Sequence, residues 1–146
     1  MKPTAEQYKK IYRAQMPKSK TGVDCLCAFT VGGMICMIGQ VFLGLYSGIQ
    51  GVDKDTAALL TSATLIALSA LLTGFGVYDR ISSFAGAGTL VPITGFANAV
   101  VSPALEFKSE GYVLGTGAKM FIIAGPVLVY GVAASVVAGL IWLLFL

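Results

Sequence analysis

Four long apolar runs dominate the chain, and the short segments between and before them hold all of its charged residues. The runs extend from Cys25 to Val52, from Thr56 to Tyr78, from Ile81 to Leu105 and from Met120 to Leu146. Each is long enough to cross a hydrocarbon core of roughly 30 Å, which takes about 20 helical residues. The apolar residues occupy consecutive positions, whereas strands of an outer-membrane barrel alternate apolar with polar residues. The pattern therefore predicts an all-α integral membrane protein with three to four transmembrane helices.

The third run, Ile81 to Leu105, is unusually rich in glycine, proline and hydroxyl residues. Pro92 lacks a backbone N–H and clashes with the preceding helical turn, and the glycines around it add backbone freedom. We therefore expect a broken or re-entrant segment, with a single Pro-kinked span as the alternative. Of the two broken forms we favour a broken crossing, which would place both chain ends in the cytoplasm. Discontinuous helices of this kind surround the solute sites of many transporters, because protein or water must satisfy the freed backbone groups.

Small and polar residues also recur at helical spacing within the first, second and last runs. In lipid such stripes allow helices to approach closely, and this is one interpretation of them. The other is a hydrated path, since polar side chains in a span avoid facing lipid. The candidate constriction and path residues are Gln40, Ser62, Ser69, Thr73, Gly86, Gly88, Pro92, Gly95 and Asn98.

Six of the ten basic residues precede the first run, at positions 2, 9, 10, 13, 18 and 20. This bias predicts a cytoplasmic N-terminus. We assign residues 1–23 to a basic amphipathic leader and residues 24–146 to a single transmembrane domain. Tyr8, Ile11 and Tyr12 share one helical face in the leader, which suits contact with an anionic leaflet; a solvated topology signal is the alternative. The bilayer is then the nearest partner of these cations, and nucleic acid is not expected.

The composition gives little support for an enzyme. Hydrophobic residues make up 56% of the chain and charged residues 12%, and the mean hydropathy is +0.82. Histidine is absent, which removes the commonest general base and transition-metal ligand. Cys25, Cys27 and Cys36 lack metal-site spacing and are most simply packing residues. We therefore predict no enzymatic activity, no metal site and no cofactor.

Three sequence segments carry a family resemblance: VGGMICMIGQ in the first run, YDRISSFAGAGTLVPITGFANAVVSPALEFKSEG through the third, and KMFIIAGPVLVYG in the last. The chain resembles the SpoVAC/SpoVAEb family of sporulation membrane proteins over nearly its whole length, and its long leader favours the AC branch. The resemblance implies a place in the spore inner membrane. It further implies a complex that loads dipicolinic acid, as its calcium chelate, during sporulation and releases it at germination. Proteins of the AC branch are regarded as mechanosensitive channels, and the implied partners are SpoVAD and SpoVAEb.

With this resemblance the broken segment becomes a candidate constriction for a planar dianion. Arg80, Lys108 and Lys119 are the candidate cations that could attract it, and they could equally be ordinary anchors at the headgroups. Our first hypothesis is a channel or translocation subunit within a hetero- or homo-oligomer. The alternative is a non-conducting scaffold that anchors the other members of the complex, for which the small-residue stripes suffice.

Overall fold

The computed structural model describes Glu6, Tyr8, Lys9, Tyr12 and residues 20–145. These residues form helices and turns, and no strand occurs among them. Three helical stretches are long and apolar enough to cross a membrane: residues 21–47, 54–74 and 112–145. The predicted all-α membrane fold is confirmed, with three span-length helices rather than four.

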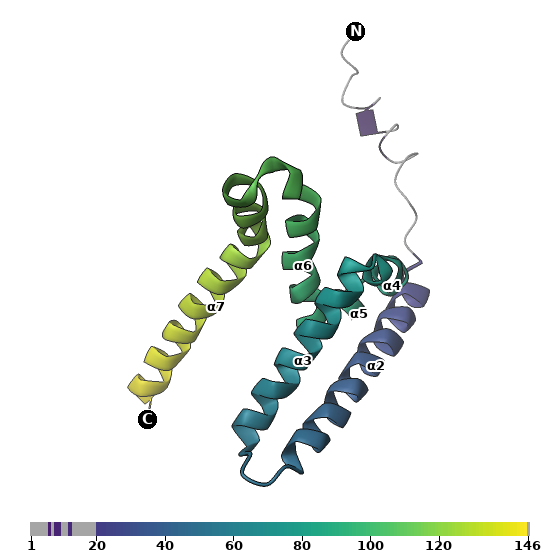
Figure 1. The fold of residues 1–146 in the computed structure, drawn as a ribbon. Coiled ribbons are helices and arrows are strands. Elements are labelled where there is room, and N and C mark those ends of the chain that lie inside the picture. The colour runs from purple at the N-terminus through teal and green to yellow at the C-terminus, as the bar shows by residue number, and fades with distance from the viewer. Residues whose placement is uncertain (1–5, 7, 10–11, 13–19, 146) are drawn as a thin grey trace.

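The first two spans form an antiparallel hairpin (Figure 1). Helix α2 (Thr21–Ser47) and helix α3 (Lys54–Gly74) are joined by a short turn and pack against each other. Near this turn the Tyr46 hydroxyl lies 2.7 Å from the Thr64 hydroxyl. The bond satisfies two polar groups between apolar helices, where neither would find water within a bilayer.

Helix α3 begins at an aspartate cap that lies outside the spanning segment. The Asp53 carboxylate accepts hydrogen bonds from the Thr56 amide at 3.4 Å and from the Thr56 hydroxyl at 2.5 Å. Both bonds stabilise the charged form, and they lower the pKa of Asp53 below its ordinary value. The contribution of this cap to stability is therefore present above the pKa of the unfolded chain and is lost as pH falls through the lower, folded-state value.

Replacement of Asp53 with asparagine should lower thermal stability near neutral pH, because the amide caps the helix but carries no charge to interact with its N-terminus. The difference in melting temperature between the two proteins should shrink as pH falls from about 6 to about 2, where the wild-type carboxylate becomes protonated. Circular dichroism in detergent measures both curves. A difference that stays constant over this range would contradict the assignment.

The third apolar run is divided into three short helices. Helix α4 (Val77–Ala85) ends at Gly86, whose φ of +50° is strained for residues with a side chain. Helix α5 (Ala87–Leu90) is a single turn, and Pro92 then forms the N-cap of helix α6 (Ile93–Glu106). The predicted break is thus confirmed, with a glycine at the first corner and a proline at the second.

Helix α6 runs parallel to α3, and two hydrogen bonds fix this direction. Ser69 bonds to Thr94, and one turn further along both helices Thr73 bonds to Asn98. A chain that had crossed the membrane after α3 would place α6 antiparallel to it. The segment therefore turns back at α4 and α5, close to the end where α2 begins, and our expectation of a broken crossing is wrong. The segment is re-entrant.

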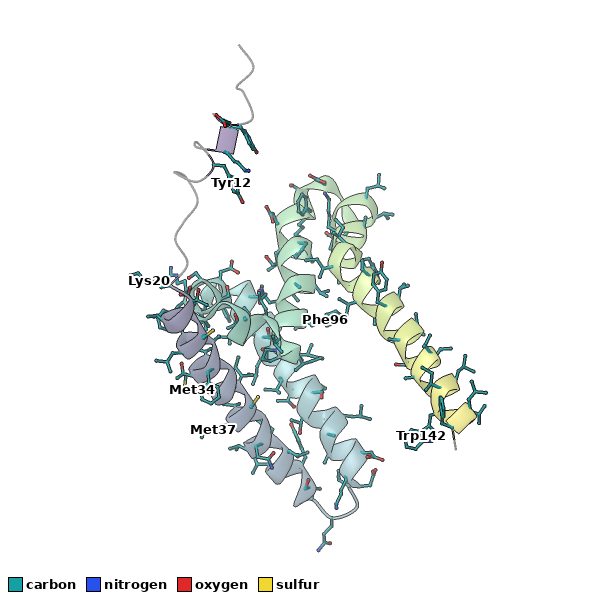
Figure 2. The ribbon with its side chains drawn as sticks, turned by 180° about the vertical axis from the view of Figure 1, so that it is seen from behind. Tyr12, Lys20, Met34, Met37, Phe96 and Trp142 are labelled. Carbon is teal, nitrogen blue, oxygen red and sulfur yellow. The ribbon has the colours of Figure 1, made fainter. Side chains whose placement is uncertain are left out.

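The remaining chain reverses direction once more before the last span. Helix α6 leads into a 3₁₀ turn, η1 (Phe107–Glu110), and a π-helical turn, η2 (Tyr112–Gly117). Helix α7 (Ala118–Phe145) then packs against α6 and η2 near its beginning, and Ala124 is its buried residue. Most of α7 extends away from α2 and α3 (Figure 1). Trp142 lies close to its far end (Figure 2), as expected for a residue at a membrane interface.

This path predicts the accessibility of introduced cysteines. In a background with the three native cysteines replaced by alanine, Ser109→Cys should react with an impermeant maleimide from the same membrane side as Lys20→Cys. A cysteine appended after Leu146 should react from the opposite side. Labelling of right-side-out and inverted vesicles measures this, and a four-span arrangement would exchange the sides of Ser109 and the chain end.

Within residues 1–19 of the leader, the four described residues are helical and exposed. Residues 21–23 belong to the first turn of α2. The Tyr8 and Tyr12 rings stack, with centroids 6.5 Å apart, as the shared helical face requires. The rest of the basic leader, including Ile11 and residues 13–19, lies outside the described residues. Its extent, its boundary at residue 23 and its contact with lipid stay predictions.

Candidate functional site

A group of buried hydroxyls lies where the re-entrant segment meets α3. Ser69, Thr89 and Thr94 are almost inaccessible, and hydrogen bonds join Thr94 to Ser69 and to Tyr78. We call this group the hydroxyl cluster. Its members are Ser69, Thr73, Tyr78, Thr89, Thr94 and Asn98.

Tyr78 ties the three short helices together. It lies on the first turn of α4, is 4% exposed, and donates its hydroxyl proton to the Thr89 carbonyl of α5 at 2.8 Å. The same hydroxyl oxygen lies 3.0 Å from the Thr94 hydroxyl of α6. One side chain thereby satisfies a backbone carbonyl at the break and a side chain beyond it.

Ser69 and Thr73 make the corresponding links from α3. The Ser69 hydroxyl donates to the Thr94 carbonyl at 2.6 Å, and Thr73 Oγ1 lies 2.8 Å from both the Ser69 carbonyl and Asn98 Oδ1. In hydrocarbon these groups would otherwise be unsatisfied, so the bonds favour the docked position of α6. The hydroxyl cluster thus holds the re-entrant segment against α3.

Two glycines permit backbones to meet at this site. A Cβ on Gly88 would lie 2.8 Å from the Ala28 Cα of α2 and would overlap the Ala28 carbonyl oxygen. A Cβ on Gly95 would lie 2.7 Å from the Leu90 carbonyl carbon. Neither contact can yield, since backbone atoms form the opposite surface in both cases.

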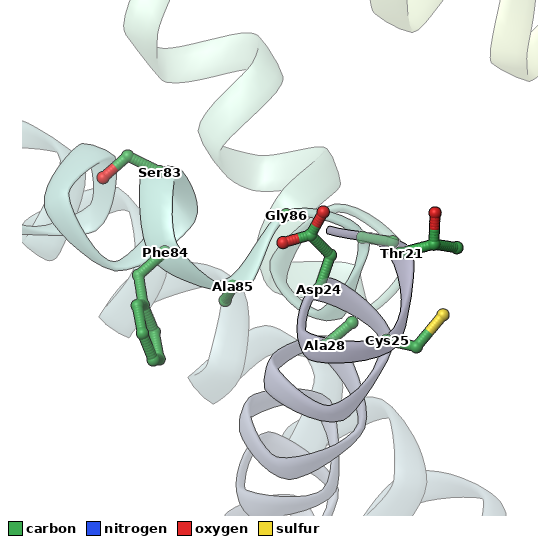
Figure 3. A pocket seen from close by; sticks show the side chains of 9 residues that line it. Thr21, Asp24, Cys25, Ala28, Ser83, Phe84, Ala85 and Gly86 are labelled. Atoms are coloured by element: carbon green, nitrogen blue, oxygen red, sulfur yellow. The ribbon is translucent and has the colours of Figure 1, made fainter. Parts of the chain in front are cut away.

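A cavity of about 470 Å³ opens between the start of α2 and the corner joining α4 to α5. We call it the mouth. Figure 3 shows the Asp24 carboxylate directed toward the turn at Gly86, with Ser83 and Phe84 on the α4 side. No basic side chain is among its lining residues, which are Thr21, Asp24, Cys25, Ala28 and residues 83–87. The mouth therefore presents a single negative charge and several backbone polar groups.

The structure brings most of the predicted path residues together. Ser69, Thr73 and Asn98 belong to the hydroxyl cluster, and Gly86, Gly88, Pro92 and Gly95 shape the break beside it. Two predicted members lie elsewhere. Gln40 is exposed on the outer side of α2 beside Met37 and Val41, and Ser62 is half-buried on α3 away from the cluster. The buried positions of α3 there are instead Ala57 and Thr61.

The three candidate cations do not line the break. Arg80 and Lys108 are exposed, on α4 and η1 respectively. The Lys119 ammonium lies 4.1 Å from the Phe107 ring centroid, a cation–π contact that fixes η1 to the start of α7. This placement agrees with their interpretation as anchors at the membrane edge rather than as solute ligands.

Sequence reasoning missed the central part of Tyr78, Thr89 and Thr94. Tyr78 directly precedes the charged pair Asp79–Arg80 and is the last residue of the second apolar run. Thr89 and Thr94 are two of several hydroxyl residues in the third run, and the pattern does not single them out. Hydroxyls placed on both sides of a Pro/Gly break need buried partners, and this requirement was the available signal.

The described part of the chain offers no cluster of metal-ligating side chains at this site. Within residues 20–145 and the four described leader positions, no three His, Cys, Asp or Glu side chains approach closely enough to hold a metal ion. Cys25 and Cys36 are exposed free thiols, and Cys27 is a half-buried one.

A comparison with protein families decides which group the chain falls in. The profile of the SpoVAC/SpoVAEB sporulation membrane proteins matches residues 24–141. The chain belongs to this family. It is also 52% identical over 136 residues to the stage V sporulation protein AC of Bacillus subtilis (strain 168), a match that covers 93% of this chain and 91% of that protein. No solved structure is significantly similar to the present chain. A role in sporulation and a place in a membrane follow for this SpoVAC/SpoVAEB member.

Proposed function

We propose that this family member is a translocation subunit for dipicolinic acid in the spore inner membrane, acting in uptake during sporulation and in release at germination. The observation that carries the proposal is the re-entrant segment, α4 to α6. It enters the membrane domain, exposes backbone groups at two breaks and returns to the same side. Such discontinuous segments recur at solute sites, since their backbone groups can exchange protein partners for solute or water.

The described arrangement corresponds to a closed state. Ser69, Thr73 and Thr94 use their hydroxyls in bonds between helices, and in the proposed closed state these bonds hold the re-entrant segment against its neighbours. Opening would require α5 and α6 to move away from α3 and free these hydroxyls. In this proposal the hydroxyl cluster is the gate, and the solute reaches it through the mouth.

The mouth favours the calcium chelate over free dipicolinate. Among the described lining residues Asp24 is the one that carries a charge, and it would repel a dianion. Calcium neutralises the two carboxylates of dipicolinate, and a hard cation can accept a further carboxylate oxygen. The acidic mouth therefore suits a neutral chelate.

Membrane tension is the stimulus in this proposal. Tension favours whichever state has the larger cross-section, and α7 connects to α2 and α3 mainly through α6 of the re-entrant segment. Two arrangements that differ little in contact energy would suffice for a switch. We further propose that the N-terminus is cytoplasmic, and that SpoVAD and SpoVAEb are partners in a larger assembly.

Purified protein in vesicles tests the proposal. Vesicles loaded with calcium dipicolinate should lose it when osmotic swelling raises tension, and free dipicolinate should leave more slowly. The Asp24→Asn variant should reduce the difference between the two solutes, and Asp55→Asn at the opposite end of α3 is the matched control. Efflux that is equal in vesicles with and without protein would contradict conduction by this chain alone.

The second candidate is a non-conducting scaffold, and the exposure of α7 favours it. Along this helix Gly131, Ser135 and Gly139 lie on the surface, and no atom of the chain would meet a Cβ at either glycine. Such a stripe suits a neighbouring transmembrane helix. A scaffold predicts no efflux under tension, together with loss of partner subunits from the membrane when Gly131 and Gly139 are replaced by leucine.

A further inference from the structure

An apolar groove separate from the mouth lies between α2 and α3, with a volume of about 260 Å³. We call it the lateral groove. Its rim side chains are between 38% and 56% exposed and come from three helices: Met34, Ile38, Leu68, Leu72 and Ile81. The floor consists of Val31 and members of the hydroxyl cluster, all buried.

The floor offers nothing to a polar occupant. Tyr78 donates to the Thr89 carbonyl, Ser69 donates to the Thr94 carbonyl, and the Thr89 hydroxyl donates to the Gly86 carbonyl at 3.0 Å. A water molecule needs two to four polar partners to occupy a cavity, and these groups are already engaged with one another. The lateral groove is therefore suited to hydrocarbon.

Close helix contacts limit the groove at both ends. A Cβ on Gly32 would lie 3.3 Å from the Gly88 carbonyl oxygen, and a Cβ on Gly39 would lie 3.4 Å from the Leu65 side chain. Gly32 and Gly39 are seven positions apart on α2, which corresponds to about 10 Å along the helix axis. A transmembrane helix is itself about 10–12 Å wide and could not lie along so short a furrow between two touching helices. A single hydrocarbon chain could.

We propose that the lateral groove holds one acyl chain of a membrane phospholipid. The groove lies at mid-span positions of α2 and α3, so acyl chains are the molecules that surround its open rim. An empty groove would forfeit dispersion contacts on its lining, and a chain that fills it restores them. The proposal does not depend on the transport activity. Its consequence is that lipid seated on Tyr78 and Thr94 shields the hydroxyl cluster.

Native mass spectrometry of the detergent-purified protein tests this proposal, with dioleoyl phosphatidylglycerol and dioleoyl phosphatidylcholine added in turn. Wild-type protein should retain a single phospholipid adduct of either kind, because the chain rather than the headgroup is held. Leu68→Trp, which fills the groove, should lose the adduct. Leu59→Trp is the matched control, since nine helical residues place it on the opposite face of α3, where Leu59 is 71% exposed.

Leu72→Trp provides a second filling variant if Leu68→Trp fails to fold, as judged by circular dichroism. Loss of the adduct from either folded filling variant, with retention in Leu59→Trp, is the expected result. Three results would overturn the proposal. They are the absence of an adduct on wild-type protein, equal retention of the adduct in the filling and control variants, and a spectrum in which the bound species is a second copy of the chain instead of a lipid.

Discussion

Substitution of Gly88 by alanine should strongly destabilise the contact between α5 and α2. The added Cβ would meet the backbone of Ala28, and neither α5 nor α2 can move aside without separating. Overpacking of this kind costs about 1–3 kcal/mol, and a rigid backbone opposite places this site near the upper end. We expect a fall in melting temperature of roughly 6–12 °C for about 3 kcal/mol in a chain of this size. Circular dichroism in detergent measures it.

Gly33→Ala is the control for this prediction. Gly33 also lies on α2, but no atom approaches the position of its Cβ within 4 Å. Alanine there removes a helix-destabilising glycine and adds no clash, so stability should be unchanged or slightly raised. Equal losses in the two variants would show that α5 does not rest on α2 as described.

Substitution of Tyr78 by phenylalanine should have the next largest effect. The ring stays, but the Thr89 carbonyl and the Thr94 hydroxyl lose their shared partner. A buried carbonyl left without this partner costs about 1–2 kcal/mol, given the modest values measured for hydrogen bonds inside membranes. We expect lower thermal stability and faster amide hydrogen exchange in α5 and at the start of α6, since the re-entrant segment would open more often.

Tyr130→Phe is the matched control, because Tyr130 is 75% exposed on α7 and its hydroxyl belongs to no described hydrogen bond. Exchange measured by mass spectrometry should rise for residues 87–98 in Tyr78→Phe and stay unchanged in the control. If exchange instead rises uniformly along the chain, Tyr78 contributes to general stability and does not hold the segment.

The hydrophobic pattern was sufficient to predict the membrane-spanning helices, because any helix that crosses the bilayer must be long and apolar. The break was also predictable, since Pro92 and the glycines cannot support a regular helix. The direction of α6 was not. Whether the chain crosses or returns depends on Ser69 meeting Thr94 and Thr73 meeting Asn98, and these pairings join residues 25 positions apart.

The candidate site was predicted in part for the same reason. Polar residues of a span avoid lipid, and this rule selects Ser69, Thr73 and Asn98, which the structure places together. That rule does not say which polar residues share one face of the folded bundle. Gln40 and Ser62 satisfied it and yet lie apart from the cluster, because the contact between α3 and α6 forms only near the break.

The dipicolinate content of spores that carry variants of the break tests the central claim most directly. Pro92→Ala and Gly95→Ala alter the second corner of the re-entrant segment, and Pro126→Ala in α7 and Gly139→Ala are their controls. With protein levels in the membrane matched, our account predicts dipicolinate-poor spores for the first pair and normal loading for the controls. Normal loading in Pro92→Ala and Gly95→Ala spores would contradict translocation at the re-entrant segment.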